Sequence, residues 1–349
     1  MTTRRQFLAQ GAAALAGATL APALLRAQDP SPPAGPRGRP IPTATGEILP
    51  EEMGITSLHE HIALRHDDGH REESLAYAIR ELQRAKALGL RTIADVGPPD
   101  DVAGIREVAR ATGINVICCT GFYLLRREQL TLKSADFESK MLHDIEHGLQ
   151  GTDVRPGVIK VAATRLPIRP AEKELFVAAA RVQQKYHLPI CTHAVSGCAH
   201  QQRILEEAGA DLRRCYFSHI EATFGWEGRS VEQEIDYLEG VVAKGSTLCF
   251  NNFGNWNHTK PEDLALIIRE LARRGHADRL VATMDLTWSF EQGKLKVLWE
   301  DTNAGGRDRT YAYLLDTAVP WMHANGISRE VTDRMILGNP RRIFTHPPA

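Results

Sequence analysis

Two histidines separated by a single residue stand near the start of the chain's apolar part, in Ser57-Leu58-His59-Glu60-His61-Ile62. Side chains alternate along an extended strand, so His59 and His61 point to one face and Glu60 to the other. Two imidazoles side by side at a strand end can bind one metal ion, each through a ring nitrogen. Because so short a motif also arises by chance, its interpretation depends on residues further along the chain.

Further ionisable residues stand at the ends of strand-like segments downstream. They are Lys160, His193, His219 and Asp285. Any one of them alone is typical of a structural polar group at a strand end. In a closed barrel of parallel strands, however, these ends meet at one mouth, so the side chains can come together.

The residue types of this set favour a particular metal chemistry. Four imidazoles and one carboxylate provide ligands for two divalent ions but no anion to bridge them. A protonated lysine cannot ligate, because it has three donors and no acceptor. Beside cations Lys160 would lose its proton more readily, and the neutral amine can add carbon dioxide. The carbamate that forms has two oxygens, one for each metal ion.

The elements that would position these residues alternate regularly along the chain. Strand-like apolar segments lie at 55–59, 92–95, 115–120, 158–162, 189–193, 215–219, 247–250 and 280–284. Helical patterns between them include 73–88, 101–111, 172–187, 230–243 and 261–274. This alternation predicts an α/β protein with a (β/α)₈ barrel as its single catalytic domain. A doubly wound open sheet is the alternative, although no Gly-x-Gly-x-x-Gly motif follows the first strand.

Two connections are longer than a barrel requires. One spans 121–133, and the other spans 286–309 and carries Trp288, Phe290 and Trp299. Loops that follow barrel strands lie at the mouth where substrate binds. Their aromatic residues would either line that mouth or pack within the loops themselves.

The first 46 residues are different in composition. Arg4-Arg5 followed by Phe7-Leu8 and an Ala/Gly/Leu-rich run predicts a twin-arginine export signal over residues 1–27. Polar residues and a proline interrupt that run, so we expect no stable membrane span after cleavage. Residues 28–46 are rich in Pro, Gly and Arg and predict a linker, with the barrel over 47–349. The expected location is the periplasm or the medium.

Charge and cysteine content argue against nucleic-acid binding and against a cysteine-bound metal site. A formal net charge of -1 and no long basic run give no basis for nucleic-acid binding. The six cysteines lack a Cys-x-x-Cys spacing, so cysteine ligation of metal is not expected. Since the twin-arginine route exports folded proteins, buried free thiols are predicted.

The chain resembles the phosphotriesterase-like branch of the amidohydrolase superfamily, whose members are binuclear metallohydrolases on (β/α)₈ barrels. The resemblance covers nearly all of residues 43–349. Apart from the six ionisable residues, similar stretches are Gly54-Ile55-Thr56, Ala111-Thr112-Gly113-Ile114-Asn115, Gly121-Phe122-Tyr123 and Gly338-Asn339-Pro340-Arg341-Arg342-Ile343-Phe344. By this resemblance, His59, His61 and Asp285 would hold the more buried of two ions. His193 and His219 would hold the more exposed one, and the lysine carbamate and a hydroxide would bridge both.

The resemblance also implies a mechanism. Ions about 3.5–4 Å apart lower the pKa of a shared water, so that hydroxide is present at neutral pH to attack the substrate. Asp285 would accept the proton and relay it outward. Tyr123 stands where lactonases of the family carry a tyrosine, and its phenol would orient substrate or stabilise an oxyanion. The alternative for Tyr123 is a tyrosine packed in its loop.

Three residues depart from the family pattern. Asn251 and Asn252 stand after strand seven where lactonases usually have an Asp-Arg pair, and Met284 stands where a polar residue is frequent. The two amides remove a charge pair that would shape the leaving-group pocket. None of the three belongs to the expected metal set, so they weaken the expectation of lactone preference but leave hydrolysis expected.

We therefore expect an exported binuclear hydrolase acting on a small molecule with an ester-like bond: a lactone, a carboxylic ester or an organophosphate triester. Zinc is the expected metal, with cobalt, manganese and iron(II) as alternatives. An amide or carbamate hydrolase of the same superfamily and a catalytically silent metal-binding barrel are the alternative functions. A homodimer is left open.

Overall fold

The computed structural model describes residues 39–62, 69–195, 197–224, 228–257, 259–291, 293–297 and 309–345. The predicted export signal, residues 1–27, lies outside these ranges. Within the described ranges, no helix has the length and apolar character needed to cross a bilayer.

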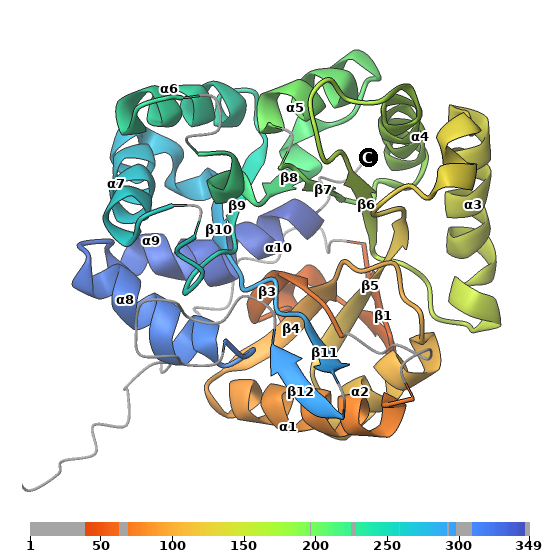
Figure 1. Ribbon diagram of the computed structural model, residues 1–349. Helices are drawn as coiled ribbons and strands as arrows, with labels where there is room; N and C mark the ends of the chain where they lie inside the picture. Colours follow the sequence, from red (N-terminus) through yellow and green to blue (C-terminus); the bar gives the residue numbers. More distant parts are fainter. Residues whose placement is uncertain are drawn as a thin grey trace, which may run out of the picture. The chain divides into compact units, whose positions relative to one another are not determined.

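Eight parallel strands form one sheet in which neighbours in the chain are neighbours in space, from β3 to β10 (Figure 1). They are β3 (Ile55–Glu60), β4 (Leu90–Asp95), β5 (Asn115–Gly121), β6 (Val158–Ala162), β7 (Ile190–His193), β8 (Cys215–Ser218), β9 (Thr247–Phe250) and β10 (Leu280–Ala282). The chain just beyond β10 returns to β3, where Asp285 N donates to His59 O at 2.9 Å and His61 N donates to Leu286 O at 3.2 Å. These bonds bring the first and last strands together, and the (β/α)₈ barrel prediction is confirmed.

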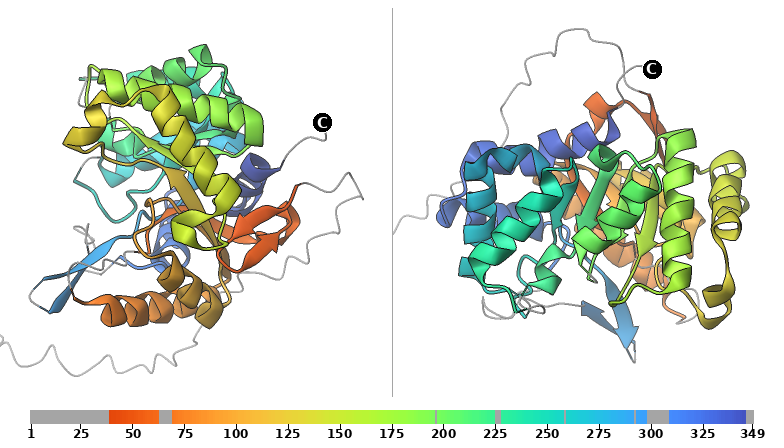
Figure 2. Two further views of the ribbon diagram at one scale, coloured as in Figure 1. Left: turned by 90° about the vertical axis from the view of Figure 1, so that its right-hand side faces the viewer. Right: turned by 90° about the horizontal axis from the view of Figure 1, so that it is seen from above.

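Helices cover the outside of the barrel (Figures 1 and 2). They are α1 (Arg71–Ala87), α2 (Val102–Thr112), α3 (Ser134–His147), α4 (Pro170–Tyr186), α5 (Cys198–Glu207), α6 (Val231–Val242), α7 (Pro261–Leu271), α8 (Val319–Ala324), α9 (Arg329–Asp333) and α10 (Asn339–Phe344). Helix α2 shows how the sequence sets such an element. The Asp101 side chain accepts from Gly104 N at its start, and Gly113 ends it at φ 64°, a conformation that glycine adopts without strain.

The barrel interior is filled with side chains beneath its mouth. Each strand contributes to this layer, which contains Leu58, Ala94, Ile117, Cys119, Val158, Cys191, Tyr216, Cys249 and Val281. A separate, larger core lies between the strands and the surrounding helices. All six cysteines are buried and unbridged, as predicted. A packed interior of this kind leaves the mouth as the place where polar groups can meet.

Strand β3 departs from simple alternation just before its histidines. Its register against β4 runs from Ser57 opposite Ile93 to Glu60 opposite Asp95, so β3 contains one extra residue there. Such a bulge lets consecutive side chains face the same side. Leu58 belongs to the interior layer, and His59 also faces inward, because its ring reaches Lys160 and Cys191. Leu58 and His59 thus both face the barrel interior, which strict alternation did not predict, whereas His59 and His61 share one side, as it did predict.

Two segments differ from the sequence-based expectation. Residues 41–48 form a hairpin of β1 (Ile41–Thr43) and β2 (Gly46–Ile48), in which Ile41 and Thr43 are buried. Ala44 N bonds to Val116 O and joins the hairpin to β5, so residues 41–46, predicted as part of a linker, are packed against the barrel. The segment 286–309, expected to be a plain loop, contains a second hairpin, β11 (Trp288–Glu291) and β12 (Lys294–Val297). It is anchored by buried Trp288, whose ring lies 4.9 Å from that of Tyr77.

Candidate metal centre

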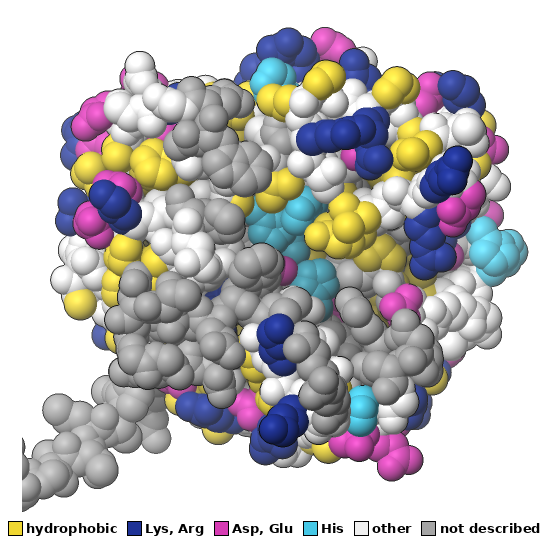
Figure 3. Space-filling model, viewed as in Figure 1, with side chains coloured by type: hydrophobic (Ala, Val, Ile, Leu, Met, Phe, Trp, Pro, Cys, Tyr) yellow, Lys and Arg dark blue, Asp and Glu magenta, His cyan; other side chains and the backbone are white. Residues whose placement is uncertain are grey.

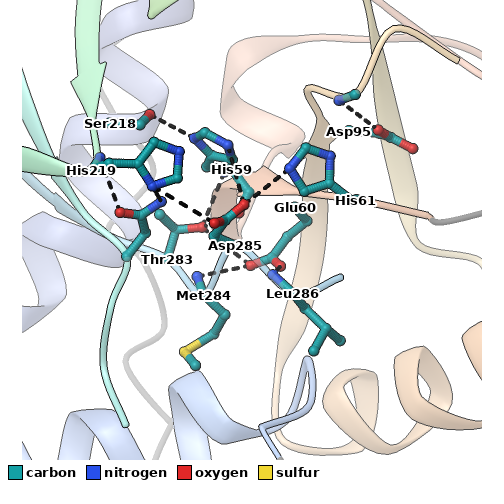
Figure 4. Close-up of polar contacts among 12 residues, drawn as sticks. His59, Glu60, His61, Asp95, Ser218, His219, Thr283, Met284, Asp285 and Leu286 are labelled. Carbon is teal, nitrogen blue, oxygen red and sulfur yellow. Dashed lines mark hydrogen bonds and ion pairs between the residues drawn. The ribbon is translucent and has the colours of Figure 1, made fainter. Parts of the chain in front are cut away.

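The six predicted ligands come together at the carboxyl ends of the strands, as the close-up shows for four of them (Figure 4). His61 Nε2 lies 3.0 Å from Asp285 Oδ1, and His59 Nε2 lies 3.4 Å from the same oxygen. Donor atoms of these three residues all lie within 4.8 Å of one another. That separation is what one ion needs in order to bind all three.

A second group of donors lies beside the first. The rings of His193 and His219 are 4.3 Å apart, and His219 is 4.9 Å from the ring of His59. Asp285 faces both groups, because its Oδ2 lies 3.7 Å from His219 Nδ1 while its Oδ1 faces His59 and His61. One carboxylate thus stands between two sets of imidazoles.

Lys160 lies beneath both groups in the barrel interior. Only 1% of its surface is exposed, and its Nζ lies 3.2 Å from His59 Nε2 and 3.7 Å from Cys191 Sγ. The amine therefore lies among the predicted ligands and away from solvent. A carbamate formed there with carbon dioxide would place negative charge next to bound cations. The set of imidazoles, carboxylate and lysine therefore fits a metal centre.

The protonation states at this site are those that metal ligands require. Burial, together with Lys160 and the other imidazoles, lowers the pKa of His59 well below its usual value. Burial likewise lowers the pKa of His193 and brings that of His219 to about 4. Burial alone would raise the pKa of Asp285, but His219 and His61 hold it well below its usual range. At neutral pH His59, His193 and His219 are therefore neutral and the Asp285 carboxylate is ionised, which are the ligating forms.

Two residues outside the predicted ligand set, Ser218 and Asn251, orient two of the imidazoles. His59 Nδ1 lies 2.6 Å from Ser218 Oγ, which leaves Nε2 facing Asp285. Asn251 is buried behind His219, where its Oδ1 accepts from His219 N at 3.1 Å and its Nδ2 lies 3.0 Å from His219 Nδ1. Contacts of this type set the orientation of metal-binding imidazoles. Asn251 thus contacts a predicted ligand, a role that the expectation about the leaving-group pocket did not include.

Two of the predicted ligands have left-handed backbone conformations. His219, directly after β8, has φ 61°, and Asp285, three residues after the end of β10, has φ 50°. Such values cost roughly 1–3 kcal/mol for a residue other than glycine and persist only where the surroundings impose them. Glu60 is one such constraint. It points away from the donor set, as predicted, yet its carboxylate accepts from Met284 N at 3.0 Å and Leu286 N at 2.9 Å, on either side of Asp285.

The sequence predicted that Glu60 faces away from the metal site, and this orientation alone indicated no role for it. Its carboxylate is fully buried, and burial raises its pKa to about 7 despite these hydrogen bonds and one from Ser57. Acidic side chains are seldom buried unless they are paired, so an acidic residue within a strand expected to be buried on both faces indicated a structural role for Glu60.

Tyr123 lies at the rim of the centre. Its ring meets that of His193 edge-on at 5.0 Å, while 40% of the residue remains exposed. Gly121 makes this approach possible: at φ 108° its missing Cβ would lie 2.0 Å from Lys160 O, so β5 runs very close to β6. Figure 3 shows histidine side chains at the surface in the middle of this face, next to hydrophobic ones. The predicted position of Tyr123 near the more exposed ligands agrees with this geometry.

Known proteins are similar to this chain in sequence and in fold. Residues 40–344 match the model of the Phosphotriesterase family. The chain is 27% identical to an aryldialkylphosphatase of Saccharolobus solfataricus, covering 85% of this chain and 97% of that protein. It is 25% identical to an N-acetyltaurine hydrolase of Danio rerio, covering 88% of this chain and 98% of that protein.

A solved structure supports the same assignment. A mutant of a phosphotriesterase-like lactonase from Deinococcus radiodurans superposes with a TM-score of 0.75 at 27% identity, covering 87% of this chain and 99% of the lactonase. Two independent features, the barrel and the length of the sequence match, thus lead to one conclusion: the chain belongs to the phosphotriesterase family.

Proposed function

We propose that this protein is a binuclear metal-dependent hydrolase that cleaves an ester-like bond in a lactone, a carboxylic ester or an organophosphate triester. The observation that carries the proposal is the convergence of His59, His61 and Asp285, whose donor atoms lie within 4.8 Å of one another. The rings of His193 and His219, 4.3 Å apart beside this cluster, support the proposal of a second ion. Lys160, as its carbamate, is the group proposed to bind both ions.

Each residue of the centre then has a defined task. His59, His61 and Asp285 would hold the more buried ion, and His193 and His219 would hold the more exposed one. Divalent ions bound there would lower the pKa of a water molecule and polarise the substrate oxygen. Asp285 has its Oδ1 engaged with His61, so its Oδ2, on the side of His219, is the atom available to accept a proton from water. The Tyr123 phenol orients substrate at the rim.

An amide hydrolase is the second candidate, because one relative is named N-acetyltaurine hydrolase. Amide cleavage requires a proton for the leaving nitrogen, which a protonated Asp285 could return. The same donor set serves both reactions, so the difference between them depends on leaving group and substrate fit. A catalytically silent barrel is disfavoured, since all six predicted ligands are present and clustered.

A substrate panel tests the proposed function. The protein is prepared metal-free, reloaded separately with zinc, cobalt or manganese, and assayed on lactones, aryl esters, phosphotriesters and N-acyl amides. We expect about two ions per chain and metal-dependent turnover of at least one ester class. Less than one ion per chain would contradict the binuclear centre. Turnover of the amides alone would replace the proposal by the second candidate.

Replacing Tyr123 by phenylalanine tests the rim residue. Without the phenol, kcat/KM should fall about tenfold, because one hydrogen bond to the substrate or its oxyanion is lost while the ring contact to His193 remains. Steady-state kinetics on the best substrate of the panel measure the change, with metal content as a check. Tyr186→Phe, on the outside of the barrel, is the matched control and should behave as wild type. Unchanged kinetics of Tyr123→Phe would leave Tyr123 as a packing residue.

A further inference from the structure

A buried arginine lies directly behind the candidate metal centre. Arg309 has no exposed surface, although guanidinium groups are seldom buried completely. Its Nη2 donates to Asn251 O at 2.8 Å and also to Met284 O. The first carbonyl follows the last residue of β9, and the second precedes Asp285 in the chain. One guanidinium therefore joins the ends of two neighbouring barrel strands.

Glu60 holds the same segment from the other side. Its carboxylate accepts from the backbone N–H groups of Met284 and Leu286, while Asp285 N donates to His59 O. Figure 4 shows the contacts of Glu60 with Met284 and Leu286. Together with the bond from Arg309 to Met284 O, they bind the peptide groups on both sides of Asp285. Asp285 has little freedom to leave its left-handed conformation.

The other carbonyl bound by Arg309 leads to the second left-handed ligand. Asn251 bonds to His219 through both atoms of its amide, and Asn251 N donates to Glu221 Oε1 at 2.7 Å. Glu221 is also buried, so Asn251 is held at N by a carboxylate and at O by a guanidinium. Arg309 is thus the group that connects the supports of His219 with those of Asp285.

We propose that Arg309, acting with Glu60, is a positioning residue that fixes the distance between Asp285 and His219 and thereby the two metal positions. It contacts the backbone carbonyls next to these ligands. The inference rests on the proposed function for the role of the ligands, but concerns how the fold holds them. A guanidinium suits this task because its planar group of donors can reach two carbonyls at once, which an ammonium on a flexible stem does poorly.

Arg309→Lys and Glu60→Gln test this inference, with Arg214→Lys as the matched control. Arg214 is also a buried arginine, but it precedes β8 and so lies at the opposite end of the barrel. Each full-length protein is loaded with cobalt(II). The measurements are cobalt affinity in competition with a chromophoric chelator, the visible absorption of the bound cobalt, the midpoint of thermal unfolding, and kcat and KM.

Arg309→Lys should bind cobalt at least about tenfold more weakly and show an altered cobalt spectrum, the size of effect typical of residues that orient metal ligands. Its kcat should fall by a similar factor, with KM within about twofold. Arg214→Lys should unfold at a lower temperature but keep the wild-type affinity and spectrum. A folded Arg309→Lys with wild-type affinity and spectrum would overturn the inference, as would an equal loss of affinity in Arg214→Lys.

If Arg309→Lys fails to fold, Glu60→Gln still tests whether these two residues position the metal ligands. The amide keeps the shape and one acceptor oxygen, so the fold should survive while the spectrum of bound cobalt changes. An unchanged spectrum and affinity would again overturn the inference. Affinity and spectrum need no substrate: a wild-type protein that binds cobalt but hydrolyses nothing contradicts only the proposed function, whereas failure to bind cobalt contradicts both.

Discussion

Lys160→Ala should lose bound metal and hydrolytic activity together, with kcat/KM falling by at least about 10³-fold. Lewis-acid stabilisation by metal is worth several kcal/mol, and each 1.36 kcal/mol is about a factor of ten in rate. The physical reason is the position of Lys160: its Nζ is 3.2 Å from His59 Nε2, inside the ring of donors. Its carbamate is the side-chain anion proposed to bridge both ions. Without it, each ion loses one ligand.

Chemical rescue separates this role from a loss of folding. Alanine leaves a cavity beneath the ligands, so formate, acetate or propionate should enter it, supply two carboxylate oxygens and restore part of the metal content and activity. Metal analysis and kinetics across a series of carboxylate concentrations measure the effect. Lys160→Met fills the space without an anion and should not be rescued.

The matched control is Lys86→Ala, which removes a partly buried lysine that bonds Thr112 O on the outside of the barrel. It should keep full metal content. Full activity of Lys160→Ala, or metal loss that no carboxylate reverses in a folded protein, would exclude the bridging role.

Asp285→Asn should reduce kcat by about 10²- to 10⁴-fold, the usual contribution of a general base, while KM changes little. The amide is uncharged and accepts a proton poorly at the atom that faces His219. Asparagine tolerates left-handed backbone conformations, so the φ of 50° at this position should be retained and the fold with it. His59 and His61 remain to bind metal, and part of the metal content should survive.

Asp144→Asn provides the control for loss of a buried carboxylate. Asp144 accepts from Thr120 Oγ1 and from Lys140 on the outside of the barrel, so its variant should lose stability but keep kcat. Thermal unfolding, metal analysis and steady-state kinetics of the two variants make the comparison. Wild-type turnover in metal-loaded Asp285→Asn would rule out Asp285 as the proton acceptor.

Much of this centre could be predicted before the fold was known. Apolar segments at 158–162 and 247–250 correspond to β6 and β9 residue for residue, because strands buried on both faces are continuous apolar runs. The same ends of other strands carried His193 and Asp285, and barrel closure brings such ends together. Residue type and spacing are local properties, so the chain itself identifies which residues are able to bind metal.

The hairpin at 41–48 shows where composition misleads. Its Pro, Gly and Thr residues are typical of a linker, yet Thr43 Oγ1 bonds Gly46 O and Ala44 N bonds Val116 O, which turn the segment back onto β5. The partner strand lies about 70 residues away along the chain, so no local pattern reports the contact. The export signal predicted for residues 1–27 stays a prediction.

The sequence by itself determined the donor set: imidazoles, a carboxylate and a lysine at strand ends, and the alternation that turned Glu60 away from the metal. Only the tertiary structure decided how those donors are held. The bulge in β3, the left-handed conformations of His219 and Asp285, and the bonds from Arg309 to two strand ends all depend on contacts between distant parts of the chain. The residue types and their spacing are written in the sequence and show which side chains can bind metal. The backbone conformation at a strand end is set by the side chains that pack against it, and these come from distant parts of the chain.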